Sequence, residues 1–250
     1  MKGAKTRLHT LMFDYEAHES GKTSTNQWHQ RTDKSVPMCG QEQDFFELHV
    51  ISTNNAEQSA MLKAAKDIWP YVHYIHIREK QLSQQECFNW AKLMAEAGVP
   101  ASRIVINGAN LYSSGHFYQG VHWSQNMLER AKVMVTPENK RDPRLRLGIS
   151  VHSLHEARIA EEYGADYLFF GHVYASASKP DSVARGLDAL SEVCSSVKVP
   201  VIAIGGIHPG NIQAVRSAGA RGAAVISSVL KHANPAYAAA LLKQAVDAVK

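Results

Sequence analysis

The sequence has few cysteines, and their spacing suggests neither a crosslink nor a metal. Cys39, Cys87 and Cys194 are the three cysteines in 250 residues, and no C-x-x-C pair occurs. This spacing argues against a disulfide framework and against a zinc site. A reducing compartment therefore fits best, and we expect a cytoplasmic protein.

Long apolar runs and basic clusters are also missing. No apolar run approaches the roughly 18 residues that span a bilayer, and the first residues lack the basic-then-apolar layout of a signal peptide. The net charge is +4, but no cluster of five or more Lys and Arg occurs. We therefore expect no membrane and no nucleic-acid partner, but a protein whose mild positive charge suits small anions.

Sustained periodicity is absent from residues 1–46. This segment holds six basic and six acidic residues, and its stretch 20–43 is polar without a helix or strand period. Such a composition predicts a poorly ordered N-terminal extension. Met38 is a candidate for the true start of translation. The segment gives no information on chemistry.

From Glu47 onward, short apolar runs alternate with segments of helical period, as in repeated βα units around a parallel sheet. The length suits one α/β domain, a (β/α)8 TIM barrel over residues 47–250. A doubly wound open sheet is the alternative. Eight runs are candidate strands: Leu48–Ser52, Tyr71–Ile77, Arg103–Ile106, Gly120–Trp123, Leu145–Val151, Tyr167–Phe170, Val201–Ile204 and Ala223–Ile226.

Helix signals lie between most of these runs. Ser153 stands three residues before Glu156, which predicts a reciprocal capping box. Gly164 and Gly219 follow helical segments, as glycines that end helices do. The amphipathic segments are Ala56–Ile68, Gln84–Ala97, His155–Tyr163, Leu187–Ser195 and Asn211–Ala218.

The ends of the last two strands have the composition of a phosphate site. The seventh run ends in Gly205 and Gly206, which expose backbone N–H groups, and the eighth ends in Ile226, Ser227 and Ser228 at a helix start. Loops after strands 7 and 8 are the usual phosphate site of TIM barrels. The glycines could instead form only a tight turn, and the serines could be only helix caps. Because both features occur together at these two loops, a phosphate-binding site is favoured.

Cations follow the second run. Period-two alternation places His76, Arg78 and Lys80 on one face, opposite Ile77. At the barrel mouth this face would meet an anionic substrate. On the outside it would be a solvated face with an Arg78–Glu79 pair.

Three other strand ends offer polar groups. Ser150 and His152 end the fifth run, and an imidazole there can move a proton near neutral pH. His172 ends the sixth run, in a loop that reaches Lys179, and Asn107 ends the third.

Carboxylates are almost absent from these strand ends. Glu79 is the single one, whereas a Mg²⁺ site for diphosphate chemistry requires Asp or Glu beside the phosphates. The sequence has no Walker loop, no G-x-G-x-x-G after the first strand and no H-E-x-x-H. We expect no metal and no cofactor.

Taken in order, these strand ends resemble the thiamine phosphate synthase/TenI superfamily. The resemblance runs from about Glu47 to the C-terminus and leaves only the extension uncovered. Each motif is modest alone, but six at barrel spacing are specific. They are His76-Ile-Arg78-Glu-Lys80, Asn107-Gly108, Gly148-Ile-Ser150-Val-His152-Ser153, Gly171-His172-Val173-Tyr174 with Lys179, Ala203-Ile-Gly205-Gly206-Ile207 and Ile226-Ser227.

Departures separate the two branches of the superfamily. Thiamine phosphate synthases carry Gln at the position of His76 and, at the position of Gly108, an Asp that binds magnesium. Their sixth loop has Gly-Pro and then Thr-x-Thr-Lys, where this chain has Gly171-His172 and then Ser176-Ala177-Ser178-Lys179. TenI-like proteins are similar to this chain at His76 to Glu79, at Asn107-Gly108, at Ser150 to Leu154 and at Gly171 to Val173.

The TenI resemblance implies a metal-independent isomerase of bacterial thiamine biosynthesis, a thiazole tautomerase. It would convert an exocyclic-alkene carboxythiazole phosphate to the aromatic 2-(2-carboxy-4-methylthiazol-5-yl)ethyl phosphate. The family's acid/base histidine falls on His152, which would protonate the exocyclic carbon. Gly205, Gly206, Ile226 and Ser227 would hold the phosphate, Arg78, Lys80 or Lys179 the carboxylate, while Asn107, Ser150 and His172 shape the pocket.

Two other functions remain open from the sequence. One is a thiamine phosphate synthase, a transferase that joins hydroxymethylpyrimidine diphosphate to thiazole phosphate. The other is a non-catalytic regulatory protein that binds thiazole or thiamine phosphates, because a fold and a site can outlive an activity. A homo-oligomer is compatible with the sequence, which does not fix the oligomeric state.

Overall fold

A computed structural model describes residues 45–109, 117–127, 142–175 and 183–248. The chain divides into residues 1–43 and 44–250, and the described residues belong to the second unit. The extension predicted for residues 1–46 lies outside the described residues, apart from its last two.

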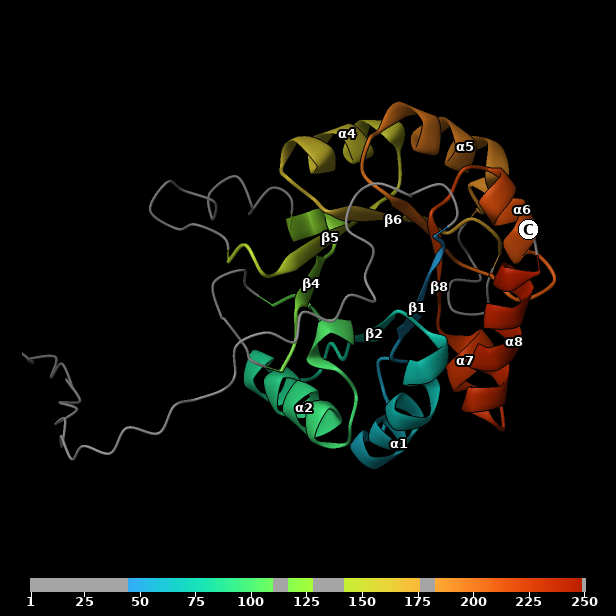
Figure 1. Ribbon diagram of the computed structural model, residues 1–250. Coiled ribbons are helices and arrows are strands. Elements are labelled where there is room, and N and C mark those ends of the chain that lie inside the picture. Colours follow the sequence, from blue (N-terminus) through green and yellow to red (C-terminus); the bar gives the residue numbers. More distant parts are fainter. Residues whose placement is uncertain (1–44, 110–116, 128–141, 176–182, 249–250) are drawn as a thin grey trace, which may run out of the picture. The chain divides into compact units, whose positions relative to one another are not determined.

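Eight parallel strands close into a barrel in sequence order, β1 next to β2 and so on to β8, which pairs with β1 (Figure 1). The predicted TIM barrel is thus confirmed, and the open doubly wound sheet is wrong. The strands are β1 Glu47–Ile51, β2 Tyr74–Ile77, β3 Ile104–Asn107, β4 Gly120–Trp123, β5 Arg146–Val151, β6 Tyr167–Gly171, β7 Val201–Ile204 and β8 Gly222–Val225.

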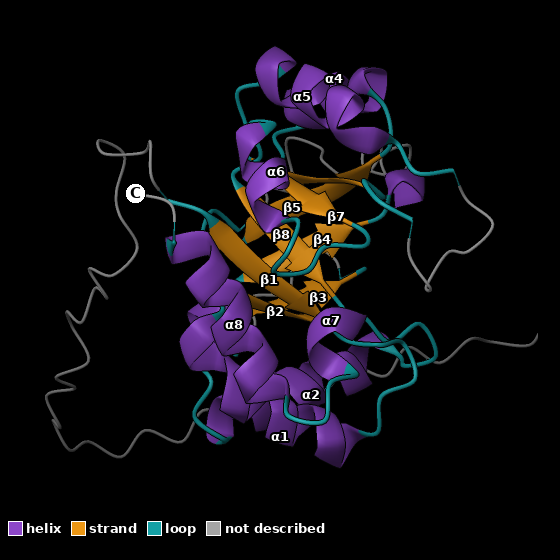
Figure 2. Ribbon diagram, turned by 90° about the vertical axis from the view of Figure 1, so that its right-hand side faces the viewer, coloured by secondary structure: helices purple, strands orange, loops and turns teal. Residues whose placement is uncertain are grey.

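Helices surround the strands (Figures 1 and 2), and each predicted helical segment overlaps one of them. Among the described residues, no helix is long and apolar enough to cross a membrane. The helices are α1 Gln58–Ile68, α2 Gln84–Glu96, α4 Leu154–Glu162, α5 Gly186–Ser196, α6 Ile212–Ser217, α7 Ser227–Leu230 and α8 Pro235–Asp247, with short 3-10 turns at Trp69–Tyr71, Ala101–Arg103 and Gln125–Met127.

Strand alternation divides the buried residues into two sets. Outward side chains such as Val50, Ile75 and Ile149 pack with the helices in one large apolar cluster. The smaller cluster inside the barrel consists of Ile51, Tyr167, Phe169, Ile202 and Ala224. Because successive side chains of a strand point to opposite faces, alternate residues share one face, and closure of the sheet decides which face becomes the barrel interior.

Helix ends follow local sequence, with one correction. Gly164 and Gly219 have φ of 77° and 95°, as expected for glycines that end helices. At α4 the Ser153 hydroxyl accepts the backbone N–H of Glu156, which is one of the two bonds of the predicted capping box. The other bond, from the Ser153 backbone N–H to the Glu156 side chain, is not formed. The Glu156 carboxylate instead accepts the backbone N–H of His152, just after β5, at 2.6 Å.

Candidate active site

A cavity of about 510 Å³ opens at the carboxyl ends of the strands. This volume lies within the range of small-molecule sites, and the position is where TIM barrels bind substrates. The predicted site residues that line it are Arg78, Lys80, Asn107, Ser150, His152, His172, Gly205, Gly206, Ile226 and Ser227. Lys179 lies outside the described residues.

His152 lies just after β5 on the wall of the cavity. Its Nδ1 is 2.7 Å from the carbonyl oxygen of Gly171, which can only accept, so Nδ1 carries a proton. The Arg185 Nε–H donates to the same carbonyl at 3.0 Å. In the neutral imidazole, Nε2 therefore holds the free electron pair and is the nitrogen available for proton transfer.

The loops after β7 and β8 form a wall with little side-chain bulk. Gly205 and Gly206 have φ of 105° and 66°. A Cβ on Gly206 would lie 2.6 Å from the Ala175 carbonyl oxygen, and a Cβ on Gly205 would overlap His172. The two glycines are thus required by the backbone path and also line the cavity, so the turn and the ligand-binding interpretations are compatible.

The serines after β8 begin a helix, α7, of only four residues. Both Ser227 and Ser228 line the cavity. Within the described part of the chain, the Ser228 hydroxyl is buried and has no hydrogen-bond partner. Buried hydroxyls are normally paired, so this atom is a candidate to bind ligand or ordered water.

Two cations stand on the β2 side of the cavity. Arg78 and Lys80 both line it, in agreement with the predicted inward alternation. Glu79 does not have the role that the solvated-face alternative gave it, as the partner of Arg78. Its carboxylate instead accepts the backbone N–H groups of Asn54 and Ala56 at 3.1 and 3.3 Å, and thereby holds the loop after β1.

The described residues that line the cavity do not make a donor set that fits Mg²⁺. Glu79 is the single carboxylate among the described lining residues, and its oxygens accept N–H groups from the β1 loop and from Gln81. Gly108 and Asn126 also line the cavity, and neither is an anionic ligand. Mg²⁺ in proteins is held through carboxylates.

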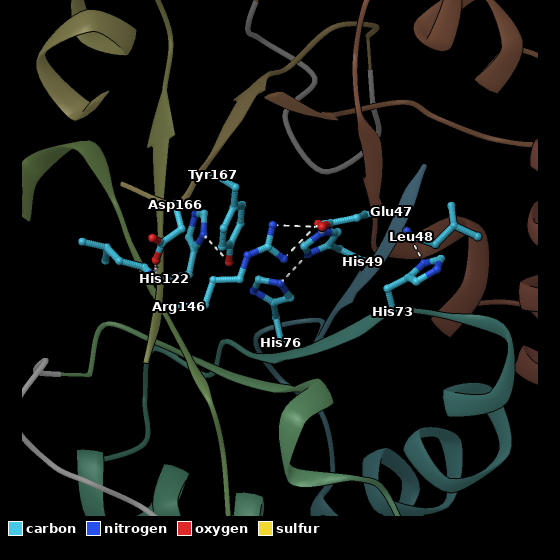
Figure 3. A network of polar contacts seen from close by, with 10 residues as sticks. Glu47, Leu48, His49, His73, His76, His122, Arg146, Asp166 and Tyr167 are labelled. Carbon is cyan, nitrogen blue, oxygen red and sulfur yellow. Dashed lines mark hydrogen bonds and ion pairs between the residues drawn. The ribbon is translucent and has the colours of Figure 1, made fainter. Parts of the chain in front are cut away.

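The barrel interior below the cavity is polar, which the sequence reasoning missed. Glu47 of β1 forms a two-pronged ion pair with Arg146 of β5, with N–O distances of 2.9 and 3.0 Å. His49 binds the same carboxylate, with its Nε2 2.8 Å from Oε2, and its Nδ1 is 2.9 Å from Nε2 of His76 (Figure 3). His76 itself does not line the cavity but contacts Asn107, which does.

A second chain crosses the interior beside it. The Tyr167 hydroxyl is 3.2 Å from Nδ1 of His122, and Nε2 of His122 is 2.8 Å from the hydroxyl of Ser150. Gly148 makes room for this contact, because a Cβ there would overlap both rings. Polar chains therefore reach the cavity wall at two points, Asn107 and Ser150.

A sequence signal for these residues exists but is weak. Glu47 and His49 in β1, and Arg146 in β5, alternate with apolar residues in strands that are otherwise buried. Period-two polar residues in such a strand indicate either a solvent face or a polar interior. The sequence does not distinguish the two, since that depends on closure of the sheet.

The buried histidines predict acid sensitivity. Burial lowers the pKa of His49, lowers that of His76 well below its usual value, and lowers that of His122 to about 3. The unfolded chain, with histidine pKa near about 6.5, then binds more protons than the folded one below that pH. Stability is therefore fully present above pH 6.5 and is lost as the pH falls toward 3.

We expect the free energy of unfolding to fall between pH 6.5 and 4.5, with up to about 1.4 kcal/mol per pH unit from each of these histidines. Urea titrations at successive pH values measure the slope. The slope of a His122→Gln variant should be smaller by about one proton. An unchanged slope would mean that His122 is not held neutral in the fold.

Comparisons with known proteins agree with the barrel fold and give the family. Residues 48–229 match the model of a protein family described as thiamine monophosphate synthase. A thiamine-phosphate synthase of Desulfitobacterium hafniense (strain Y51) is 37% identical over 184 residues, which cover 72% of this chain and 86% of that protein. One from Albidiferax ferrireducens is 34% identical over 182 residues, or 70% of this chain and 79% of that protein.

Solved structures give the same fold. A thiamine phosphate pyrophosphorylase from Pyrococcus furiosus superposes with a TM-score of 0.64 at 26% identity, covering 82% of this chain and 98% of that one. A 3-hexulose-6-phosphate synthase, at 18% identity and a TM-score of 0.60, shares the fold alone. The names of the relatives favour the synthase alternative over the tautomerase that the strand-end residues predict.

Proposed function

Because the chain belongs to the thiamine monophosphate synthase/TenI family, we propose that its cavity binds a thiazole phosphate and that His152 isomerises it. The family is one of thiamine-biosynthetic enzymes, and a phosphorylated small molecule suits a cavity bordered by cations and bare glycine loops. The isomerase reaction and the assignment of residues are our proposal. The relatives reported above are named thiamine-phosphate synthase, which is the transferase and not the isomerase.

One observation carries the isomerase proposal. At the wall of the cavity, Nδ1 of His152 is held by the Gly171 carbonyl, which leaves Nε2 as the acid/base nitrogen. The Glu156 carboxylate fixes the His152 backbone N–H from the first turn of α4. An imidazole held at Nδ1, on a backbone that is itself hydrogen-bonded, is suited to proton transfer from Nε2 at a defined ligand atom.

The proposed reaction balances without any other reagent. Neutral Nε2 of His152 removes the proton from the ring carbon that bears the carboxylate, and the C–H electron pair enters the ring. The exocyclic double bond shifts, and its outer carbon takes the proton back from Nε2. The ring becomes aromatic, which provides the driving force, and His152 returns to its starting state.

The residues proposed to bind the phosphate and the carboxylate of the substrate are assigned from their positions on the cavity wall. Gly205, Gly206 and the two serines that begin α7 lie where a phosphate would be bound, and the unpartnered Ser228 hydroxyl supports this placement. Arg78 and Lys80 are the described cations that can neutralise the carboxylate. Lys179 stays a prediction from the sequence.

The second candidate is a thiamine phosphate synthase, and the names of the relatives favour it. Against it stands the donor set, because the described lining residues offer only Glu79 as a carboxylate and its oxygens already accept N–H groups. A diphosphate leaving group without a metal anchor would have to rely on Arg78 and Lys80.

Two assays on the full-length protein distinguish the candidates. In the first, the exocyclic-alkene carboxythiazole phosphate is added in the presence of EDTA, and aromatisation is followed by ultraviolet absorbance. In the second, thiazole phosphate and hydroxymethylpyrimidine diphosphate are added with Mg²⁺, and release of diphosphate is measured. We expect turnover in the first assay and background in the second.

Each other outcome contradicts the proposal in a specific way. Diphosphate release with no aromatisation would make the protein a synthase. Tight binding of the aromatic product, with no turnover in either assay, would make it a phosphate-ligand-binding regulatory protein.

A further inference from the structure

A hydrogen-bonded chain runs through the barrel from the Glu47–Arg146 ion pair through His49 to His76 (Figure 3), and from there to the wall of the cavity. Glu47 Oε2 is 2.8 Å from His49 Nε2, His49 Nδ1 is 2.9 Å from His76 Nε2, and His76 Nδ1 is 3.1 Å from Oδ1 of Asn107. Both histidines are fully buried. The chain is continuous, and only its last member lines the cavity.

The Glu47 end of the chain can only accept. Burial by itself would raise the pKa of this carboxyl, but the hydrogen bond from His49 and the charge of Arg146 outweigh it and lower the pKa to about 2. The ionised carboxylate accepts two N–H groups from Arg146 and one from His49. Nε2 of His49 must therefore carry a proton.

The direction of every following bond is then determined, provided that both histidines are neutral. A neutral imidazole has one donor and one acceptor nitrogen. His49 Nδ1 accepts, so His76 Nε2 donates to it and His76 Nδ1 must accept as well. Asn107 therefore donates its amide N–H to His76. The two ends of an asparagine amide are nearly isosteric and are assigned from such a network.

The structure has the opposite orientation, with Oδ1 of Asn107 toward His76, and that orientation requires a proton on His76 Nδ1. One imidazole of the chain would then be an imidazolium. The charge of Glu47 is already balanced by Arg146 at 2.9 Å, so this imidazolium would be an uncompensated buried cation. Such a charge costs several kcal/mol even after relaxation. The neutral chain is favoured.

We propose that Glu47, His49 and His76 are positioning residues that turn the Asn107 amide so that its carbonyl oxygen faces the cavity. At that wall the cavity then offers an acceptor. It would bind an N–H or O–H group of a ligand, or the guanidinium of Arg78 from the neighbouring β2 side, and it would repel a carboxylate or phosphate oxygen. Anionic groups of a ligand are thereby directed to the cations and the glycine loops.

This inference does not depend on which reaction the protein catalyses. Its first test is a ¹⁵N NMR spectrum of the full chain labelled at histidine, because protonated and unprotonated ring nitrogens have very different shifts. We expect both His49 and His76 to be protonated at Nε2 and unprotonated at Nδ1. A protonated Nδ1 on His76 would overturn the proposal.

An Asn107→Asp variant tests the same chain from its other end. A carboxylate cannot donate, so the proton pattern of the chain must change, and a proton should appear on His76 Nδ1. In an Asn107→Ala variant the pattern should stay that of the wild type, because Glu47 still determines it. A residue that only fills space would give the same pattern in both variants, and that result would contradict the proposal.

The signals of His122 provide an internal control. It belongs to the neighbouring chain from Tyr167 to Ser150, so its tautomer should be the same in the wild type and both Asn107 variants.

Rescue by a conservative substitution tests the relay itself. Glutamine at position 76 offers one donor and one acceptor, whereas leucine offers neither. The side-chain N–H of Asn107 should stay protected from solvent exchange in His76→Gln and lose protection by at least about tenfold in His76→Leu, which corresponds to roughly 1.4 kcal/mol. Equal protection in both variants, or loss in both, would refute the relay. If His76→Leu does not fold, the Asn107→Asp spectrum decides alone.

Discussion

Replacing His152 with asparagine is expected to lower turnover of the carboxythiazole phosphate by about 10²–10⁴-fold, as for the loss of a general acid/base. Asparagine is the informative choice, because its Nδ2–H can still donate to the Gly171 carbonyl that now binds His152 Nδ1 at 2.7 Å. The wall of the cavity should therefore keep its structure while losing Nε2. Absorbance assays give the rate, and calorimetry with the aromatic product phosphate should show a nearly unchanged dissociation constant.

His155→Asn is the matched control. His155 is exposed on the first turn of α4, three residues from His152, and does not line the cavity. The His155→Asn variant should turn over at the wild-type rate.

Imidazole added to a His152→Ala variant should restore part of the activity if proton transfer is the missing step. A His152→Asn enzyme as fast as wild type, or a His172→Asn enzyme that alone is inactive, would show that the catalytic histidine is misassigned.

Replacing Arg146 with methionine is expected to destabilise the barrel by about 3–5 kcal/mol, the cost of leaving one partner of a buried ion pair alone. Arg146 donates both N–H groups that bind Glu47 from across the barrel, and its guanidinium lies 4.5 Å from the centre of the Tyr167 ring. Methionine keeps most of the apolar stem but leaves the carboxylate with His49 alone. Urea-induced unfolding at pH 7.5 measures the loss.

A double variant separates the charge from the packing. In Glu47→Gln/Arg146→Met no carboxylate remains to be compensated, so it should regain a large part of the stability that Arg146→Met loses. If the double variant is less stable than Arg146→Met by the full cost of a second substitution, the two residues act independently. The ion pair would then not be the origin of the effect.

Membership of the family does not decide between its two reactions. Identities of 34–37% to thiamine-phosphate synthases reflect the whole barrel, most of which is core and helix surface. In our proposal the reaction depends on a few atoms at the strand ends, such as Nε2 of His152 and the missing side chain of Gly108. Fold and function are separable in this way in many barrel proteins, so the assays outweigh the names of relatives.

The sequence by itself determined the barrel and ten of the residues that line the cavity. Eight apolar runs and the helical segments between them predicted the strands, because strand and helix periods are local properties of the chain. In a parallel barrel all strand ends meet at one face. Residues as far apart as Arg78 and Ser227 could therefore be assigned to one cavity before any contact between them was known.

Only the tertiary structure decided what lies inside the barrel and which atoms of the site are available. The pairing of Glu47 with Arg146 joins residues 99 positions apart, and no local pattern selects that partner. The same holds for the Gly171 carbonyl that leaves Nε2 of His152 free, and for the carboxylate of Glu79, which binds a neighbouring loop. Hydrogen bonds between distant strands depend on the closure and register of the sheet. A side chain's chemical type is written in the sequence, but its protonated atom and its partner are set by the fold.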